Sequence, residues 1–153
     1  MHIPADAQPT LEAFLRLVRD TLPAEAGLRP APDAWTLKEI VGHLIDSASN
    51  NHQRFVRLQF GSLEHFPPYE AEPWVAAQRY AEADWTSLAL LWKAYNDHLL
   101  HVIQGIPEAA LANAWQHPDG PKTLEFLVRD YYAHLSLHVD HYATRLAEVR
   151  AMG

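Results

Sequence analysis

The chain has 153 residues, of which 48% are hydrophobic, five are tryptophan and none is cysteine. This composition excludes an intrinsically disordered chain, a disulfide framework, a cysteine-ligated metal site and a cysteine nucleophile. Nineteen acidic and twelve basic residues give a formal net charge of −7, which argues against binding to nucleic acid or to an anionic membrane surface. The sequence has no secretory signal and no apolar run long enough to span a bilayer, so we expect a soluble, cytoplasmic protein.

Four segments repeat their apolar residues with the period of an α-helix, and they predict helices over residues 10–22, 36–60, 85–104 and 123–150. Thr36 and Glu39 have the spacing of a capping box at the start of the second helix. The sequence HPDGP at residues 117–121 is a strong turn signal. No segment alternates apolar and polar residues as a half-buried strand does, so we expect no sheet.

The connection between the second and third helices covers residues 61–84 and contains Pro67 and Pro68, which are incompatible with a helix interior. Within it, only residues 74–80 are expected to form a short helix. The connection is long enough to run the length of a bundle, so the second and third helices can be parallel. We therefore expect an all-α, single-domain protein: a four-helix bundle in up-down-down-up order, with a long crossover loop between helices 2 and 3.

Long loops in compact domains tend to be functional or to cross over the fold. We expect residues 61–80 to close one end of this bundle, with Phe66, Tyr69 and Trp74 packed on helix ends or on a partner chain. An ordinary crossover with no role in access to a site is an equally good interpretation of the same residues.

Ten histidines stand out in the composition, and several of them fall in a pattern. The last predicted helix carries polar residues spaced i, i+4, i+7, i+11 along the edge of its apolar stripe: His134, His138, His141 and Arg145. The second predicted helix has a line with the same spacing: His43, Ser47, Asn50 and Arg54. If the two lines face each other, they form a polar cleft.

Such a cleft favours a metal site. Neutral imidazole is a good ligand for zinc, nickel, copper and iron, and an i, i+4 pair can place two ring nitrogens on one ion. His134 and His138 would supply two ligands and His43 a third, which leaves positions open for water or substrate. The alternative is that these histidines are ordinary residues at a helix margin that never meet.

The remaining titratable residues near these lines are given lesser roles. Asp46 and Asp140 turn away from the histidine lines, so they are interpreted as solvated surface residues or as outer partners of the ligands. His98 and His101 are interpreted as surface histidines, and His52 as a residue near the core or the opposite margin. The nearby Ser/His pair lacks the carboxylate and oxyanion hole that nucleophilic catalysis needs.

At these residues the sequence resembles the DinB/YfiT-like four-helix-bundle family. The resemblance lies in WTLKEIVGHLIDS at residues 35–47 and YAHLSLHVDH at residues 132–141, and it extends over almost the whole chain. It implies an up-down-down-up bundle and a divalent metal, often zinc or nickel, held by His43, His134 and His138. The activities it implies are those of metal-dependent hydrolases or of transferases that use bacillithiol, mycothiol or glutathione.

The leading hypothesis is therefore a metal-dependent hydrolase or thiol transferase acting on a small molecule. Asn50, Arg54, His141 and Arg145 are the candidates for orienting substrate, and the arginines favour an anionic substrate or a low-molecular-weight thiol. A missing carboxylate beside the histidines weakens the hydrolase, which needs a general base. The alternatives are a non-catalytic metal- or small-molecule-binding stress-response protein and a purely structural bundle. A homodimer is compatible with each of these hypotheses.

Overall fold

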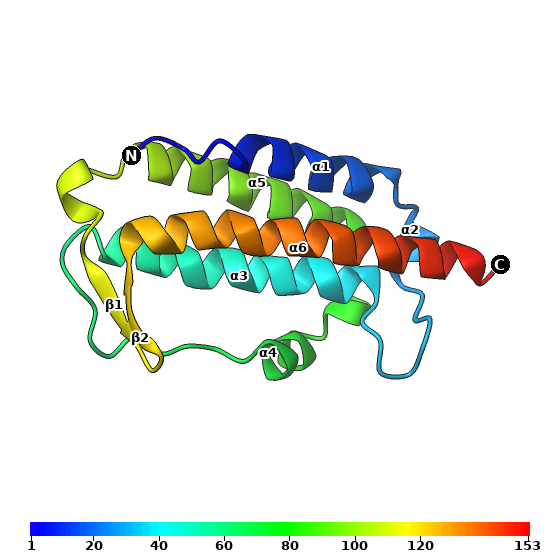
Figure 1. The fold of residues 1–153 in the computed structure, drawn as a ribbon. Coiled ribbons are helices and arrows are strands. Elements are labelled where there is room, and N and C mark those ends of the chain that lie inside the picture. The colour runs from blue at the N-terminus through cyan, green and yellow to red at the C-terminus, as the bar shows by residue number, and fades with distance from the viewer.

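A computed structural model describes all residues from 1 to 153, and 66% of them are helical. Four long helices form the bundle: α1 (Ala7–Asp20), α3 (Leu37–Arg57), α5 (Trp85–Gln104) and α6 (Leu124–Ala151). Figure 1 shows that α3 and α5 run in the same direction and that α1 and α6 run in the opposite one. The expected four-helix bundle, with its parallel second and third long helices, is therefore present. None of its helices is both long and apolar enough to cross a membrane.

The ends of the two helices that carry the histidines are fixed by local hydrogen bonds. At the start of α3, the backbone N–H of Glu39 donates to the Thr36 hydroxyl at 3.2 Å, and the Glu39 carboxylate accepts from the Thr36 N–H at 2.7 Å. This is the predicted capping box, and it satisfies two otherwise unpaired donors. At the start of α6, the Thr123 hydroxyl accepts from the N–H of Phe126 at 3.1 Å.

The expectation of no sheet is wrong in one place. An antiparallel hairpin, β1 (Ala114–His117) and β2 (Gly120–Thr123), precedes α6, and the predicted turn at residues 117–121 joins its strands. Each strand has only four residues, so neither is long enough to show alternation in the sequence. A long-range contact supports the hairpin instead: Trp115 is buried, and its indole N–H donates to the Phe66 carbonyl at 2.7 Å.

The crossover between α3 and α5 contains α4 (Ala71–Gln78) and a 3-10 turn, η1 (Tyr80–Glu82). Figure 1 shows that the crossover runs along the side of α3, so the expectation that it closes one end of the bundle is wrong. Phe66 packs on the hairpin, with its ring 6.4 Å from the Trp115 ring. Trp74 packs against Tyr69 at 5.0 Å but stays 39% exposed, so it is only partly withdrawn from water.

The two remaining short helices, α2 (Pro23–Ala26) and the 3-10 turn η2 (Glu108–Ala110), lie in the other connections between long helices. The core contains an aromatic cluster in which the Phe14 ring lies 4.7 Å from Trp92 and 5.1 Å from Tyr142. This cluster joins α1, α5 and α6. The helix α3 packs against both α5 and α6, and the candidate site lies between α3 and α6.

Candidate metal centre

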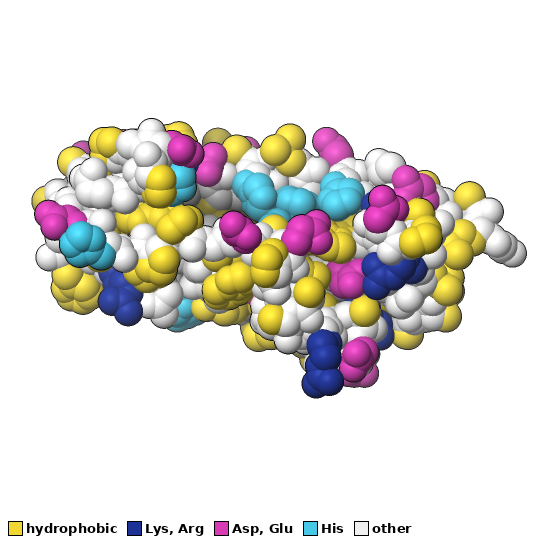
Figure 2. All heavy atoms as spheres, turned by 90° about the horizontal axis from the view of Figure 1, so that it is seen from below, with side chains coloured by type: hydrophobic (Ala, Val, Ile, Leu, Met, Phe, Trp, Pro, Cys, Tyr) yellow, Lys and Arg dark blue, Asp and Glu magenta, His cyan; other side chains and the backbone are white.

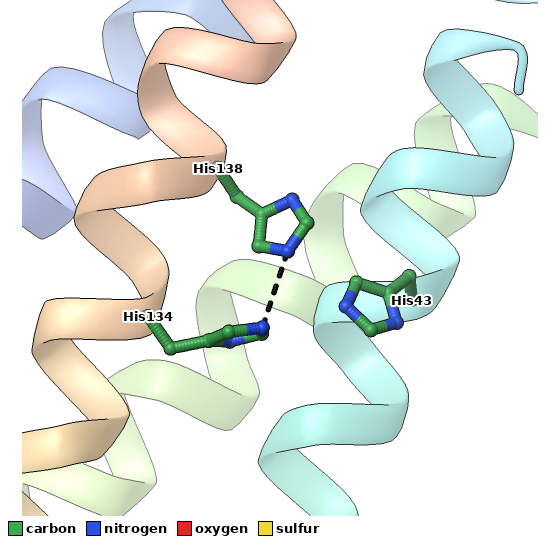
Figure 3. Close-up of side chains that lie close together, drawn as sticks. All are labelled: His43, His134 and His138. Carbon is green, nitrogen blue, oxygen red and sulfur yellow. Dashed lines mark hydrogen bonds between the residues drawn. The ribbon is translucent and has the colours of Figure 1, made fainter. Parts of the chain in front are cut away.

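Three histidines converge between α3 and α6, which lie side by side in Figure 1. His43 comes from α3, and His134 and His138 come from successive turns of α6; their rings point toward one another in Figure 3. One ligand nitrogen from each lies within 4.8 Å of the other two. The sequence placed these residues on two polar lines that could face each other, and the structure brings them together.

The spacing of the α6 pair fits a metal ion. The Nε2 atoms of His134 and His138 are 3.2 Å apart. A tetrahedral ion with metal–nitrogen bonds of about 2.0–2.1 Å separates its ligand nitrogens by roughly 3.3–3.4 Å. The His43 ring is buried beside this pair, with its centre 5.5 Å from that of His134 and 4.7 Å from that of His138. These observations fit a three-histidine site for a divalent ion.

Burial keeps these imidazoles neutral, which is the form that binds metal. Desolvation, followed by the neighbouring His134 and His141, lowers the pKa of His43 to about 4. Desolvation and the surrounding histidines lower the pKa of His138 to about 3. The pKa of His134 is also lowered by burial, although the nearby Asp130 acts in the opposite direction.

Asp46 lies one turn beyond His43 on α3. Its surroundings differ from the sequence interpretation, which was a solvated residue or an outer partner of the ligands. It is buried, and its Oδ1 atom accepts from the Tyr80 hydroxyl at 2.7 Å and from the Gln78 amide at 2.8 Å. Burial raises its pKa. The residue therefore fastens the end of the crossover to α3. Asp140 is exposed, as expected.

His141 and Arg145 extend the histidine row beyond His138. The Nδ1 atoms of His141 and His138 are 3.3 Å apart. Arg145 is committed to protein partners: it pairs with Glu148 at 2.8 Å and donates to the Trp35 carbonyl. Figure 2 shows histidine side chains in a row on one face of the molecule.

Asn50 and Arg54 lie on the other side of the cluster and face different spaces. The Asn50 amide donates to the Asp46 carbonyl at 2.9 Å, and its side chain borders a hollow under the crossover near Tyr95. Arg54 instead lines a cavity of about 220 Å³ that reaches His134. The two residues that the sequence placed on one line therefore border different hollows.

The cavity beside His134 is formed by α3, α6, the crossover and the hairpin. Its polar lining includes residues that sequence reasoning missed, among them Tyr69, Lys122 and Asp130. Asp130 lies four residues before His134 on α6, and that i, i+4 spacing was a signal that could have found it. Lys122 comes from the unpredicted hairpin, so no sequence pattern pointed to it.

Comparisons with known proteins agree with this fold. YfiT of Bacillus subtilis (strain 168), a proposed metal-dependent hydrolase, is 23% identical over 142 residues, which are 92% of this chain and 76% of YfiT. The solved structure of YfiT, described as an unusual four-helix bundle topology, matches with a TM-score of 0.79 at 20% identity, over 97% of this chain and 84% of that one.

A mycothiol-dependent maleylpyruvate isomerase has a TM-score of 0.73 at 14% identity, over 88% of this chain but only 56% of the isomerase. At these identities the two structures establish a shared fold. The model of the DinB superfamily matches residues 8–141, and the chain therefore belongs to the DinB superfamily.

Proposed function

We propose that this protein is a metal-dependent enzyme that holds one divalent ion, zinc or nickel, with His43, His134 and His138. The observation that carries the proposal is the convergence of three neutral imidazoles at the edge of a cavity, with ligand atoms within 4.8 Å of one another. Three protein ligands leave coordination positions open, which is the arrangement of a catalytic rather than a structural zinc site.

A divalent ion at this position would supply Lewis acidity, which lowers the pKa of a coordinated water or thiol toward neutrality. The chain contributes the rest. Burial holds the three ligands in the neutral form, and the cavity brings a small molecule to the edge of the site at His134. Of the four residues predicted to orient that molecule, Arg54 lines the cavity and His141 lies beside His138, whereas Asn50 borders a different hollow and Arg145 is paired with Glu148.

Two reactions are compatible with this site. Hydrolysis needs a general base, and Asp130 provides a carboxylate in the cavity next to His134. Transfer of a low-molecular-weight thiol needs a base less, because the ion itself stabilises the thiolate. The fold shared with a mycothiol-dependent isomerase supports a test of thiol transfer alongside hydrolysis.

The test is metal analysis of protein purified without a nickel column, followed by activity screens with a panel of esters and amides and with glutathione, mycothiol and bacillithiol. We expect about one ion per chain and turnover that chelation abolishes and metal restores. Absence of bound zinc or nickel, even after loading, would contradict the proposal. Stoichiometric metal without turnover in either screen would favour a non-catalytic metal-binding protein.

A further inference from the structure

Arg54 is the one arginine of this chain whose side chain is buried, at 5% exposure. Its Cζ atom lies 4.1 Å from the centre of the Trp115 ring and 5.6 Å from that of Phe66. These cation–π contacts replace part of the hydration that the guanidinium loses. They do not supply a counter-ion.

No acidic residue pairs with Arg54. Its side chain makes a single hydrogen bond, from Nη1 to the Asn51 Oδ1 atom at the long distance of 3.5 Å, and its Nε atom is buried without any acceptor. An arginine keeps its charge in proteins, and a buried charge without a partner is costly. The Nε and Nη2 edge of the guanidinium is therefore a set of donors that the protein itself leaves unused.

The Arg54 side chain forms part of the wall of the cavity beside His134. Arg54 and Lys122 both line it, while Asp130 is the one carboxylate there and is exposed. This cavity thus carries positive charge in a protein whose formal net charge is −7. Arg145, by contrast, already has Glu148 as its counter-ion, so its charge does not call for an anionic ligand.

The geometry points to a subsite in which Arg54 binds the carboxylate of a small organic acid. A planar carboxylate is the anion that a guanidinium binds best with its parallel N–H donors, and it would supply the counter-ion that Arg54 lacks. The cavity volume of about 220 Å³ is below that of sites that enclose drug-sized ligands, so the acid is small. This inference rests on the proposed function for the reaction, and it names the class of substrate that reaches His134.

The test measures binding without metal, so it is independent of the metal proposal. Benzoate and its neutral analogue benzamide are titrated into chelator-treated protein at about pH 7.5, and dissociation constants are taken from protein-observed NMR. Because hydrogen bonds to a charged group are the strong ones, we expect benzoate to bind about tenfold to a hundredfold more tightly than benzamide.

Three variants locate the effect. Arg54→Gln should abolish the preference for benzoate. Arg54→Lys should retain part of it, because lysine keeps the charge but lacks the parallel N–H donors of a guanidinium. Arg57→Gln is the matched control: this arginine lies on the same helix and over the same Phe66 ring, but its guanidinium pairs with Gln53 and lies outside the cavity. It should keep the full preference.

Equal affinities for benzoate and benzamide in the unaltered protein would overturn the inference, and so would an undiminished preference in Arg54→Gln. Tighter binding of inorganic phosphate than of benzoate would overturn the assignment to a carboxylate. Should Arg54→Gln fail to fold, the benzoate and benzamide comparison in unaltered protein and in Arg54→Lys still decides the question. A protein that binds benzoate in this way but binds no metal would contradict the metal proposal and leave the carboxylate subsite standing.

Discussion

Two groups of three histidines lie on neighbouring helices of this bundle, and they differ in convergence and in burial. The ligand atoms of the first group lie within 4.8 Å of one another: His43, His134 and His138. The second group spans α3 and α5, and its ligand atoms do not come together in this way: His52, His98 and His101. Only the first group offers three converging nitrogens.

Burial separates the two groups as clearly as distance. His43 is 6% exposed and has an unpartnered ring nitrogen, whereas His98 and His101 lie in water. In the second group, the Nδ1 atom of His52 is already engaged by the Tyr95 hydroxyl at 2.9 Å. Histidines gathered on adjacent helices are therefore not enough for a metal site. The rings must also share a point and lack other partners.

The largest expected effect separates the groups by metal content. His138→Ala should reduce bound metal from about one ion per chain to nearly none, because two remaining imidazoles hold an ion far less tightly. His98→Ala, the matched change in the second group, should leave the content unchanged. Elemental analysis of both variants, purified without a nickel column, checks this. Equal occupancy in the two variants would place the ion elsewhere.

The next effect concerns acid stability of the metal-free protein. The pKa of His43 is about 4 in the folded state, against about 6.5 in the unfolded chain. The unfolded chain therefore takes up the proton first, so stability from this residue is complete above about pH 6.5 and is lost as pH falls toward about 4. A difference of about 2.5 units corresponds to on the order of 3 kcal/mol.

Urea unfolding of the chelated protein at several pH values tests this expectation. His43→Gln should reduce the pH dependence between about pH 6.5 and 4, because one buried titrating histidine is gone while His134 and His138 remain. His98→Gln should keep the dependence of the unaltered chain, since that side chain is exposed. A pH dependence that is the same in His43→Gln as in the unaltered chain would mean that His43 is not held neutral by the fold.

A smaller effect probes the packing beside His43. A Cβ atom added at Gly42 would lie 2.2 Å from the ring of Tyr80. Gly42→Ala should therefore destabilise the protein by about 1–3 kcal/mol through overpacking. At Gly105 the nearest atom to an added Cβ lies at 3.5 Å, so Gly105→Ala should change stability by no more than about 0.5 kcal/mol. Unfolding free energies of equal size for the two variants would show that the close approach of Tyr80 is unimportant.

The smallest expected effect treats the second histidine group as structural. Tyr95→Phe removes the hydroxyl that bonds to His52 and should cost about 0.5–1.5 kcal/mol of stability. Metal content should not change. A fall in bound metal in this variant would show that the second group takes part in binding.

Much of this fold could be predicted because its signals are local. The helical period, the Thr36–Glu39 capping box and the turn at residues 117–121 each depend on neighbours in sequence. The hairpin was missed because its short strands are held by a distant contact, from the Trp115 indole to the Phe66 carbonyl. The path of the crossover was likewise set by packing on α3, which no local pattern records.

The candidate site, like the fold, could be predicted where its signals are local in sequence. Helical spacing placed His43, His134 and His138 at the margins of two apolar stripes, and the structure shows that their ligand atoms converge. Spacing could not reveal that Asp46 is buried under the crossover, because the residues that cover it come from another part of the chain. It also could not reveal that Arg54 lacks an acidic partner, since that depends on every element packed around it.

The most direct test of the account is an anomalous-difference map from crystals of the metal-loaded protein, recorded at the absorption edge of the bound metal. We expect one peak between α3 and α6, about 2.0–2.2 Å from a ring nitrogen of each of His43, His134 and His138. A peak beside His52 and His98, or no peak between α3 and α6 in protein that carries stoichiometric metal, would contradict the three-histidine site.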